Sequence, residues 1–230
     1  MEESIENPKK SLKEQTIIRF TSLASYIFPF ITVFPNTAWW FGIMVFPFFY
    51  YILLFISNPQ MYPIPTPDFG NPVVLVIIAI VVVTILYLSW SVVLLHRLKG
   101  VGLVTTGPYR LVRHPQYLSF IIITGIMTLL SAWILPPWSS GIGWYSPIGF
   151  QITWIVVLTC YALFAKLEER FLSNQYQEEL ATYKNEVGFF IPGVKSKNDI
   201  IEILSGILIP FVIFFVVLTA VNYSGIILLS

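Results

Sequence analysis

Arg113, His114 and Tyr117 form a compact group of side chains that can do chemistry, set between two long apolar stretches. Pro115 stands beside His114, and proline suits the first turn of a helix, where its missing N–H costs no hydrogen bond. The free N–H groups and the dipole of such a helix start favour negative charge. Arginine adds a pair of parallel donors that match a carboxylate or phosphate. This spacing therefore predicts an anion-binding site at the beginning of a helix.

A second polar segment further along the chain carries two adjacent carboxylates, Glu168 and Glu169. The segment has apolar side chains at three-and-four spacing, which is typical of one helical face: Leu172, Tyr176, Leu180 and Tyr183. We expect an amphipathic helix that folds back along the membrane or over the Arg113 loop, unless Ser173-Asn174 breaks it. Glu169 projects toward the same face, where a carboxylate is costly unless it meets a cation or donor. The simpler interpretation is a pair of boundary carboxylates neutralised by Arg170.

The composition shows what kind of protein must hold these residues. Of 230 residues, 56% are hydrophobic and only 11% are charged, against roughly a quarter charged in an average soluble domain. So few charges exclude an ordinary soluble enzyme, and so much apolar surface excludes a disordered chain. The 13 basic and 12 acidic residues give no basic excess for nucleic acid. We predict an all-α, polytopic helical membrane protein.

Apolar runs of about 20 residues are long enough to cross a bilayer as helices. Six runs qualify, at 17–35, 38–57, 73–95, 117–135, 147–165 and 203–228. We expect five to six transmembrane helices in one domain, 1–230, with a cytoplasmic cofactor pocket. All Lys and Arg residues fall within 9–19, 97–113 and 166–197. The positive-inside rule places the second and third of these basic segments in the cytoplasm, and the intervening spans then favour a non-cytoplasmic N-terminus.

Other kinds of site chemistry have little support. Two histidines and one cysteine do not supply a zinc site of the usual kind, so we predict no metal. The sequence has no glycine-rich phosphate loop or dinucleotide fingerprint and no serine nucleophile elbow.

The motifs together resemble a known family. Residues 103–117 read Leu-Val-Thr-Thr-Gly-Pro-Tyr-Arg-Leu-Val-Arg-His-Pro-Gln-Tyr, and Glu168-Glu169, Tyr183 and Ile191-Pro192-Gly193 follow. This combination resembles the isoprenylcysteine carboxyl methyltransferase family, to which phospholipid N-methyltransferases are similar in the same two segments. The resemblance covers about 73–194, and the last apolar helix, 203–228, is additional. It implies an integral membrane enzyme that transfers a methyl group from S-adenosylmethionine to a lipophilic acceptor at the cytosolic face, above all the carboxylate of a prenylated cysteine.

The resemblance also implies roles for individual residues. The expected cofactor-binding residues are Leu103, Val104, Tyr109, His114, Pro115, Tyr117, Glu168 and Tyr183. Arg113 and Glu169 are the expected catalytic residues, with Arg113 orienting a carboxylate of the acceptor or of the cofactor. The expected partners are the lipophilic or prenylcysteine acceptor and membrane lipids, without nucleic acid, and the oligomeric state stays open. Ser119 departs from the family, which often has glycine there.

The physical chemistry of the reaction agrees with these roles. Acidic and aromatic groups suit the sulfonium and ammonium of S-adenosylmethionine, and an acceptor carboxylate is already ionised near neutral pH. Such a transfer needs no base, so catalysis would rest on positioning and desolvation.

Two alternatives differ in function. Membrane sterol reductases share the Arg-His-Pro-x-Tyr element but bind NADPH, and they usually show an Asp with a Cys and a Lys-Tyr-Gly run in the second segment. Here that segment holds Glu168-Glu169 and Gln175-Tyr176-Gln177, which favours methyl transfer. The other alternative is an inactive membrane scaffold, and the intact motifs argue against it.

Overall fold

The structure is a computed structural model, and it describes residues 37–57, 69–98, 102–134, 146–196 and 198–224. Its internal contacts divide the chain into Met1–Ile43 and Met44–Ser230. Apart from the start of its first described helix, every element below belongs to the second unit.

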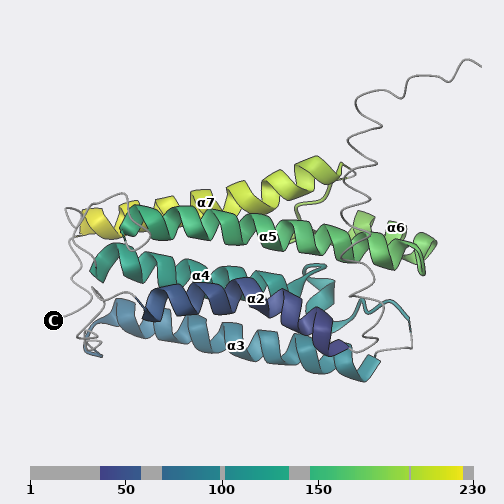
Figure 1. The fold of residues 1–230 in the computed structure, drawn as a ribbon, viewed down its shortest axis with the longest axis horizontal. Coiled ribbons are helices and arrows are strands. Elements are labelled where there is room, and N and C mark those ends of the chain that lie inside the picture. The colour runs from purple at the N-terminus through teal and green to yellow at the C-terminus, as the bar shows by residue number, and fades with distance from the viewer. Residues whose placement is uncertain (1–36, 58–68, 99–101, 135–145, 197, 225–230) are drawn as a thin grey trace, which may run out of the picture. The chain divides into compact units, whose positions relative to one another are not determined.

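The described residues form helices and turns, with one isolated β-bridge between Val112 and Gly188. Along the chain the described helices are α2 (Thr37–Ile56), α3 (Pro72–Leu98), the 3₁₀ turn η2 (Gly107–Arg110), α4 (Pro115–Ile134), α5 (Pro147–Ser173), α6 (Gln177–Glu186) and α7 (Asp199–Ser224). Figure 1 labels the α-helices. The predicted all-α class is confirmed.

Four described helices are long and apolar enough to cross a membrane, which confirms the predicted membrane protein. They are Pro72–Leu98, Pro115–Ala132, Ile148–Ser173 and Asp199–Ala220. The expected count of five to six was too high for the described residues. The predicted span 17–35 lies outside them, and the next span contributes a shorter apolar helix, Val45–Ile56.

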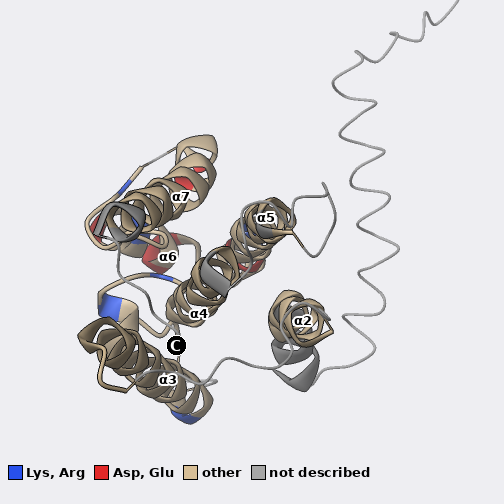
Figure 2. Cartoon of the chain, turned by 90° about the vertical axis from the view of Figure 1, so that its left-hand side faces the viewer, with Lys and Arg blue, Asp and Glu red and all other residues tan. Residues whose placement is uncertain are grey.

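Helix α4 lies beside α3, α5 and α7 (Figure 2). Its buried hydroxyl groups link it to two neighbouring helices. The hydroxyls of Thr128 and Tyr51 on α2 are 2.5 Å apart, and Trp154 Nε1 on α5 donates to Thr124 Oγ1 at 3.2 Å. Interhelical hydrogen bonds of this kind stabilise helix packing in lipid.

The outward faces of α3 and α7 are apolar and suit contact with lipid tails. On α3, Val83 and Leu86 are each 64% exposed, and on α7 Val216 is 63% exposed. The charged side chains with the deepest burial gather instead near the first residue of α4, where α5 and α7 also supply charged groups. The fold thus brings polar chemistry to one end of an apolar helical bundle.

The predicted amphipathic segment consists of two helices. Helix α5 ends at Ser173, where Asn174 forms the C-cap, and α6 begins at Gln177. The break therefore falls at Ser173-Asn174, one of the possibilities that the sequence leaves open. The predicted apolar face is confirmed on α6, where Leu180 and Tyr183 are buried while Glu178 and Glu179 are exposed.

Candidate functional site

Two loops distant in sequence meet at the start of α4. The backbone N–H of Arg113 donates to the carbonyl of Gly188 at 2.9 Å, within the isolated bridge that joins Val112 to Gly188. A Cβ at position 188 would lie 2.2 Å from the carbonyl oxygen of Ile191. Only glycine therefore fits here, and the contact fixes the loop that carries Phe189 beside Arg113.

A closed ring of alternating charges lies next to this contact. We define the charge ring as Arg113, Lys166, Glu169 and Glu202. Arg113 donates to Glu169 Oε1 and to Glu202 Oε1. Lys166 Nζ donates to the second oxygen of each carboxylate, to Glu169 Oε2 at 3.0 Å and to Glu202 Oε2. The four residues are between 2% and 6% exposed, so each buried charge has two opposite charges as partners, which offsets its loss of solvation.

Further contacts join the charge ring to its surroundings. Phe189 places its ring centroid 5.4 Å from the guanidinium carbon of Arg113 and 4.7 Å from Lys166 Nζ, at cation–π distance. Lys184 on α6 contacts Glu169 Oε2 at 2.7 Å. Asp199 accepts from Lys166 at 2.7 Å, but its side chain is 56% exposed. The charge ring therefore ties together the loop before α4 and the helices α5, α6 and α7.

His114 lies between the two adjacent carboxylates of α5. Its Nδ1 is 3.3 Å from Glu168 Oε2, and its Nε2 is 3.3 Å from Glu169 Oε1. Burial lowers the pKa of His114, but hydrogen bonds to Glu168 and Glu169 and their charges raise it by more. The net effect is a pKa above the ordinary value of 6.5. An acceptor at each ring nitrogen favours the doubly protonated imidazolium.

Four of the predicted cofactor-binding residues gather in an apolar cluster that includes the ends of α3 and α6. Tyr109 and Tyr183 are buried there, with Leu103 and Val104 partly buried against them. Tyr183 donates its hydroxyl to the carbonyl of Tyr109 at 2.5 Å, and burial raises the pKa of both phenols. Gln116 Nε2 donates to the Tyr109 hydroxyl at 2.5 Å, which connects this cluster to the first turn of α4.

The remaining predicted residues lie around His114. Pro115 begins α4 as expected, and the ring centroid of Tyr117 is 5.6 Å from that of His114. Ser119, where the family often has glycine, is fully buried and donates to the carbonyl of Pro115 at 2.9 Å. The helix thus accommodates the serine hydroxyl without an unpaired polar group.

The contacts of Arg113, Glu168 and Glu169 in the structure differ from those that the sequence indicates. Both terminal nitrogens of Arg113 are engaged by internal carboxylates. The cations that contact Glu169 are Arg113, Lys166 and Lys184, whereas Arg170, the expected neutralising partner, is exposed. Glu168 keeps a side chain that is 27% exposed and is the more accessible carboxylate of the pair.

Sequence reasoning missed Lys166, Gly188, Phe189 and Glu202. The signal for Glu202 was available, since it is an acid directly before the predicted span 203–228. The α-helix in fact begins at Asp199, so Glu202 lies inside the span. Acids within transmembrane segments usually pair or face the protein interior. Its partner could not be read from spacing, because Arg113 is distant in the chain.

Glu169, Asp199 and Glu202 lie close enough together to hold a metal ion. Lys166 Nζ, however, hydrogen-bonds to all three carboxylates. The lysine ammonium therefore supplies the positive charge at the position where a cation would bind.

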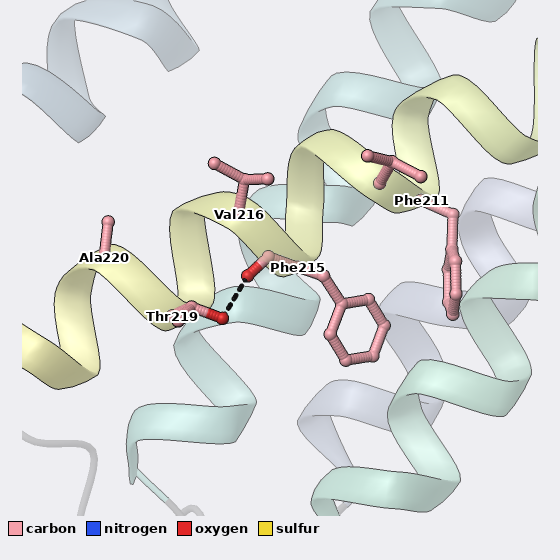
Figure 3. A pocket seen from close by; sticks show the side chains of 6 residues that line it. Phe211, Phe215, Val216, Thr219 and Ala220 are labelled. Atoms are coloured by element: carbon pink, nitrogen blue, oxygen red, sulfur yellow. Dashed lines mark hydrogen bonds between the residues drawn. The ribbon is translucent and has the colours of Figure 1, made fainter.

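A shallow apolar groove of about 650 Å³ lies along the later part of α7 (Figure 3). Its lining residues all come from that helix: Phe211, Val212, Phe215, Val216, Thr219 and Ala220. The Thr219 hydroxyl donates to the carbonyl of Phe215 at 2.7 Å, so its proton is bonded within the helix. A surface of this kind suits contact with lipid and offers no reactive group.

Comparison with protein families gives one match. The model of the isoprenylcysteine carboxyl methyltransferase family matches residues 70–136, a stretch that contains α3, η2, α4 and the Arg113-His114-Pro115 element. The match confirms the resemblance predicted from the sequence and supports a membrane methyltransferase. Glu168, Glu169 and Glu202 lie outside the matched stretch. The comparisons with curated proteins and with solved structures gave no match.

Proposed function

We propose that this membrane protein transfers a methyl group from S-adenosylmethionine to a lipophilic acceptor at the cytosolic face, with the carboxylate of a prenylated cysteine as the preferred acceptor. The observation that carries the proposal is the contact between His114 and Glu168. It joins the family-matched element at the start of α4 to the predicted second segment on α5. The two segments expected to enclose the cofactor are therefore adjacent.

The chemistry of the residues around Glu168 fits this cofactor. A half-buried carboxylate accepts hydrogen bonds from an ammonium and attracts a sulfonium, and aromatic faces add cation–π attraction. Tyr117 lies beside His114, and Glu168 raises the pKa of Tyr109 in addition to the larger effect of burial. When bound, S-adenosylmethionine would supply an electrophilic methyl group and leave as the neutral thioether.

In this proposal the two expected catalytic residues act through their neighbours. Arg113 and Glu169 hold each other and the charge ring, and both are at most 4% exposed. They fix the backbone before α4 and the orientation of His114. Glu168, His114 and Tyr117 would hold the cofactor from one side, and Leu103, Val104, Tyr109, Pro115 and Tyr183 would form the wall of the pocket.

A lipophilic acceptor is the class that suits a site at the end of apolar helices. The hydrocarbon tail can stay in the bilayer beside α3 and α7, whose outer faces are apolar, while the polar group reaches the charged end. The cytosolic side follows from the positive-inside rule, since the basic segments 97–113 and 166–197 flank the site.

Methyl transfer can be tested directly on the detergent-purified protein. Labelled S-adenosylmethionine is incubated with a synthetic farnesylated cysteine, its methyl ester, or phosphatidylethanolamine. The proposal predicts base-labile label on the free farnesylated cysteine and none on its ester. Label on the phospholipid alone would keep methyl transfer and replace the acceptor. A folded protein that labels none of the acceptors would contradict the proposed function.

A further inference from the structure

We infer that Glu202, on α7, is a positioning residue for the proposed methyl transfer, because it closes the charge ring that fixes Arg113 next to His114. This inference rests on the proposed function and assigns part of it to a helix that lies outside the matched family stretch 70–136. It also gives a reason for a buried acid in the last span.

Deep burial and two ion pairs distinguish Glu202 from Asp199, the other acid in the first turn of its helix. It is 2% exposed, and each of its oxygens contacts a different cation, Arg113 or Lys166. A carboxylate in such a place is stable only with close opposite charges. The neighbouring Asp199 also contacts Lys166, but its side chain is 56% exposed. Glu202 is therefore the α7 acid that reaches the buried site.

Loss of Glu202 would change the charge balance around Glu169. Arg113, Lys166 and Lys184 all contact Glu169 already. Without Glu202, Arg113 and Lys166 lose their second buried carboxylate and compete for Glu169. The Glu169 oxygen that His114 contacts at 3.3 Å is the one that Arg113 also uses.

The consequence reaches the accessible side of the site through His114. The same imidazole contacts Glu169 through Nε2 and Glu168 through Nδ1. A shift of Glu169 would therefore rotate the imidazole of His114. That rotation would displace Glu168, the carboxylate proposed to face the cofactor. Small displacements of positioned groups can reduce turnover by up to about a hundredfold.

A purely structural role of Glu202 predicts a different result, namely lower stability with normal turnover of the folded fraction.

The test compares Glu202→Gln with Glu202→Asp, which keeps the charge, and with the matched control Asp199→Asn on the same helix. The double variant Lys166→Met/Glu202→Gln removes one cation and one anion, so it restores charge balance and supports folding where Glu202→Gln alone does not. Melting temperature, kcat and KM for S-adenosylmethionine are measured for each protein.

We expect folded Glu202→Gln to lose kcat by roughly tenfold or more. The double variant should also lose kcat, because Arg113 still lacks its second carboxylate even though Lys166 no longer competes for Glu169. Glu202→Asp should recover part of the loss, and Asp199→Asn should stay within about twofold of the natural protein. Normal kcat in folded Glu202→Gln, or in the double variant if Glu202→Gln does not fold, would overturn the inference. A natural protein without methyl transfer would instead refute the proposed function, so the two failures are distinguishable.

Discussion

Glu168 and Glu169 are neighbours in the sequence, yet their side chains are 27% and 3% exposed. Both carboxylates contact His114, but Glu169 also contacts Arg113, Lys166 and Lys184, whereas Glu168 lies at the accessible side. One carboxylate therefore organises the protein interior, and the other is available to a bound molecule. The paired acids in this segment therefore divide into one buried and one accessible carboxylate.

Glu168→Gln tests this division on the accessible side. The substitution removes a negative charge that faces the proposed cofactor, so S-adenosylmethionine should bind about tenfold more weakly, a loss of roughly 1.4 kcal/mol. The melting temperature should fall less than in Glu169→Gln, because Glu168 contributes to the charged state of His114 but is partly solvated. Titration of the purified variant measures the affinity, with Glu178→Gln on the exposed face of α6 as the control. Unchanged affinity would remove Glu168 from the cofactor site.

Glu169→Gln should mainly lower the stability of the folded protein. It leaves buried cations without their shared partner, and loss of one member of a buried ion pair costs about 3–5 kcal/mol. Thermal unfolding in detergent should show a large decrease in melting temperature. A protein as stable as the natural one would contradict the buried charge ring.

The charge state of His114 predicts a pH dependence of stability. The folded-state pKa of His114 is raised above 6.5 because the contributions of Glu168 and Glu169 exceed the opposing effect of burial. The stabilisation from the charged imidazole is therefore complete below the unfolded pKa and is lost as pH rises through the folded pKa. The difference in melting temperature between the natural protein and His114→Gln should be fully developed below about pH 6 and should shrink on alkalinisation. A difference that grows with pH would contradict the assignment.

Gly188→Ala should damage the site through the backbone. The added Cβ would lie 2.2 Å from the carbonyl oxygen of Ile191, so the loop that carries Phe189 must move away from Arg113. Gly193→Ala is the comparison, since nothing lies within 4 Å of its Cβ and only its φ of +79° is unfavourable. That backbone penalty is about 1–2 kcal/mol. Gly188→Ala should destabilise the protein more than Gly193→Ala in thermal unfolding, and the reverse order would contradict the close approach.

Tyr183→Phe probes the apolar cluster of the proposed pocket wall. The variant removes the hydroxyl that donates to the buried carbonyl of Tyr109, which should cost about 1–3 kcal/mol of stability. Burial raises the pKa of Tyr183, so the phenol stays protonated through neutral pH and the cost should be the same at each pH. Chemical denaturation at several pH values measures it. A stability loss that vanishes at neutral pH would argue against this hydrogen bond.

The sequence predicts one half of the site well. The helix start at Pro115 follows from the missing N–H of proline, and the inward direction of Glu169 agrees with its three-residue spacing to Leu172 on the same helix. Both are local properties, since they depend on residues within a few turns. The match to the family over residues 70–136 contains the helix start at Pro115, whereas Glu169 lies outside it.

The other half depends on tertiary contacts that spacing does not encode. Arg113 was expected to orient a carboxylate of the acceptor or cofactor, but in the structure Glu169 and Glu202 occupy both of its terminal nitrogens. A helical wheel shows that Glu169 faces inward and does not show which cations it meets. The packing of α7 against α5 supplies Glu202, and only the fold reveals that pairing.

We propose above all that this membrane protein binds S-adenosylmethionine between the start of α4 and the end of α5. The most direct measurement titrates S-adenosylmethionine and NADPH in parallel against the detergent-purified protein and against Glu168→Gln. We predict saturable binding of S-adenosylmethionine that Glu168→Gln weakens. Binding of NADPH alone would contradict the claim and indicate a reductase.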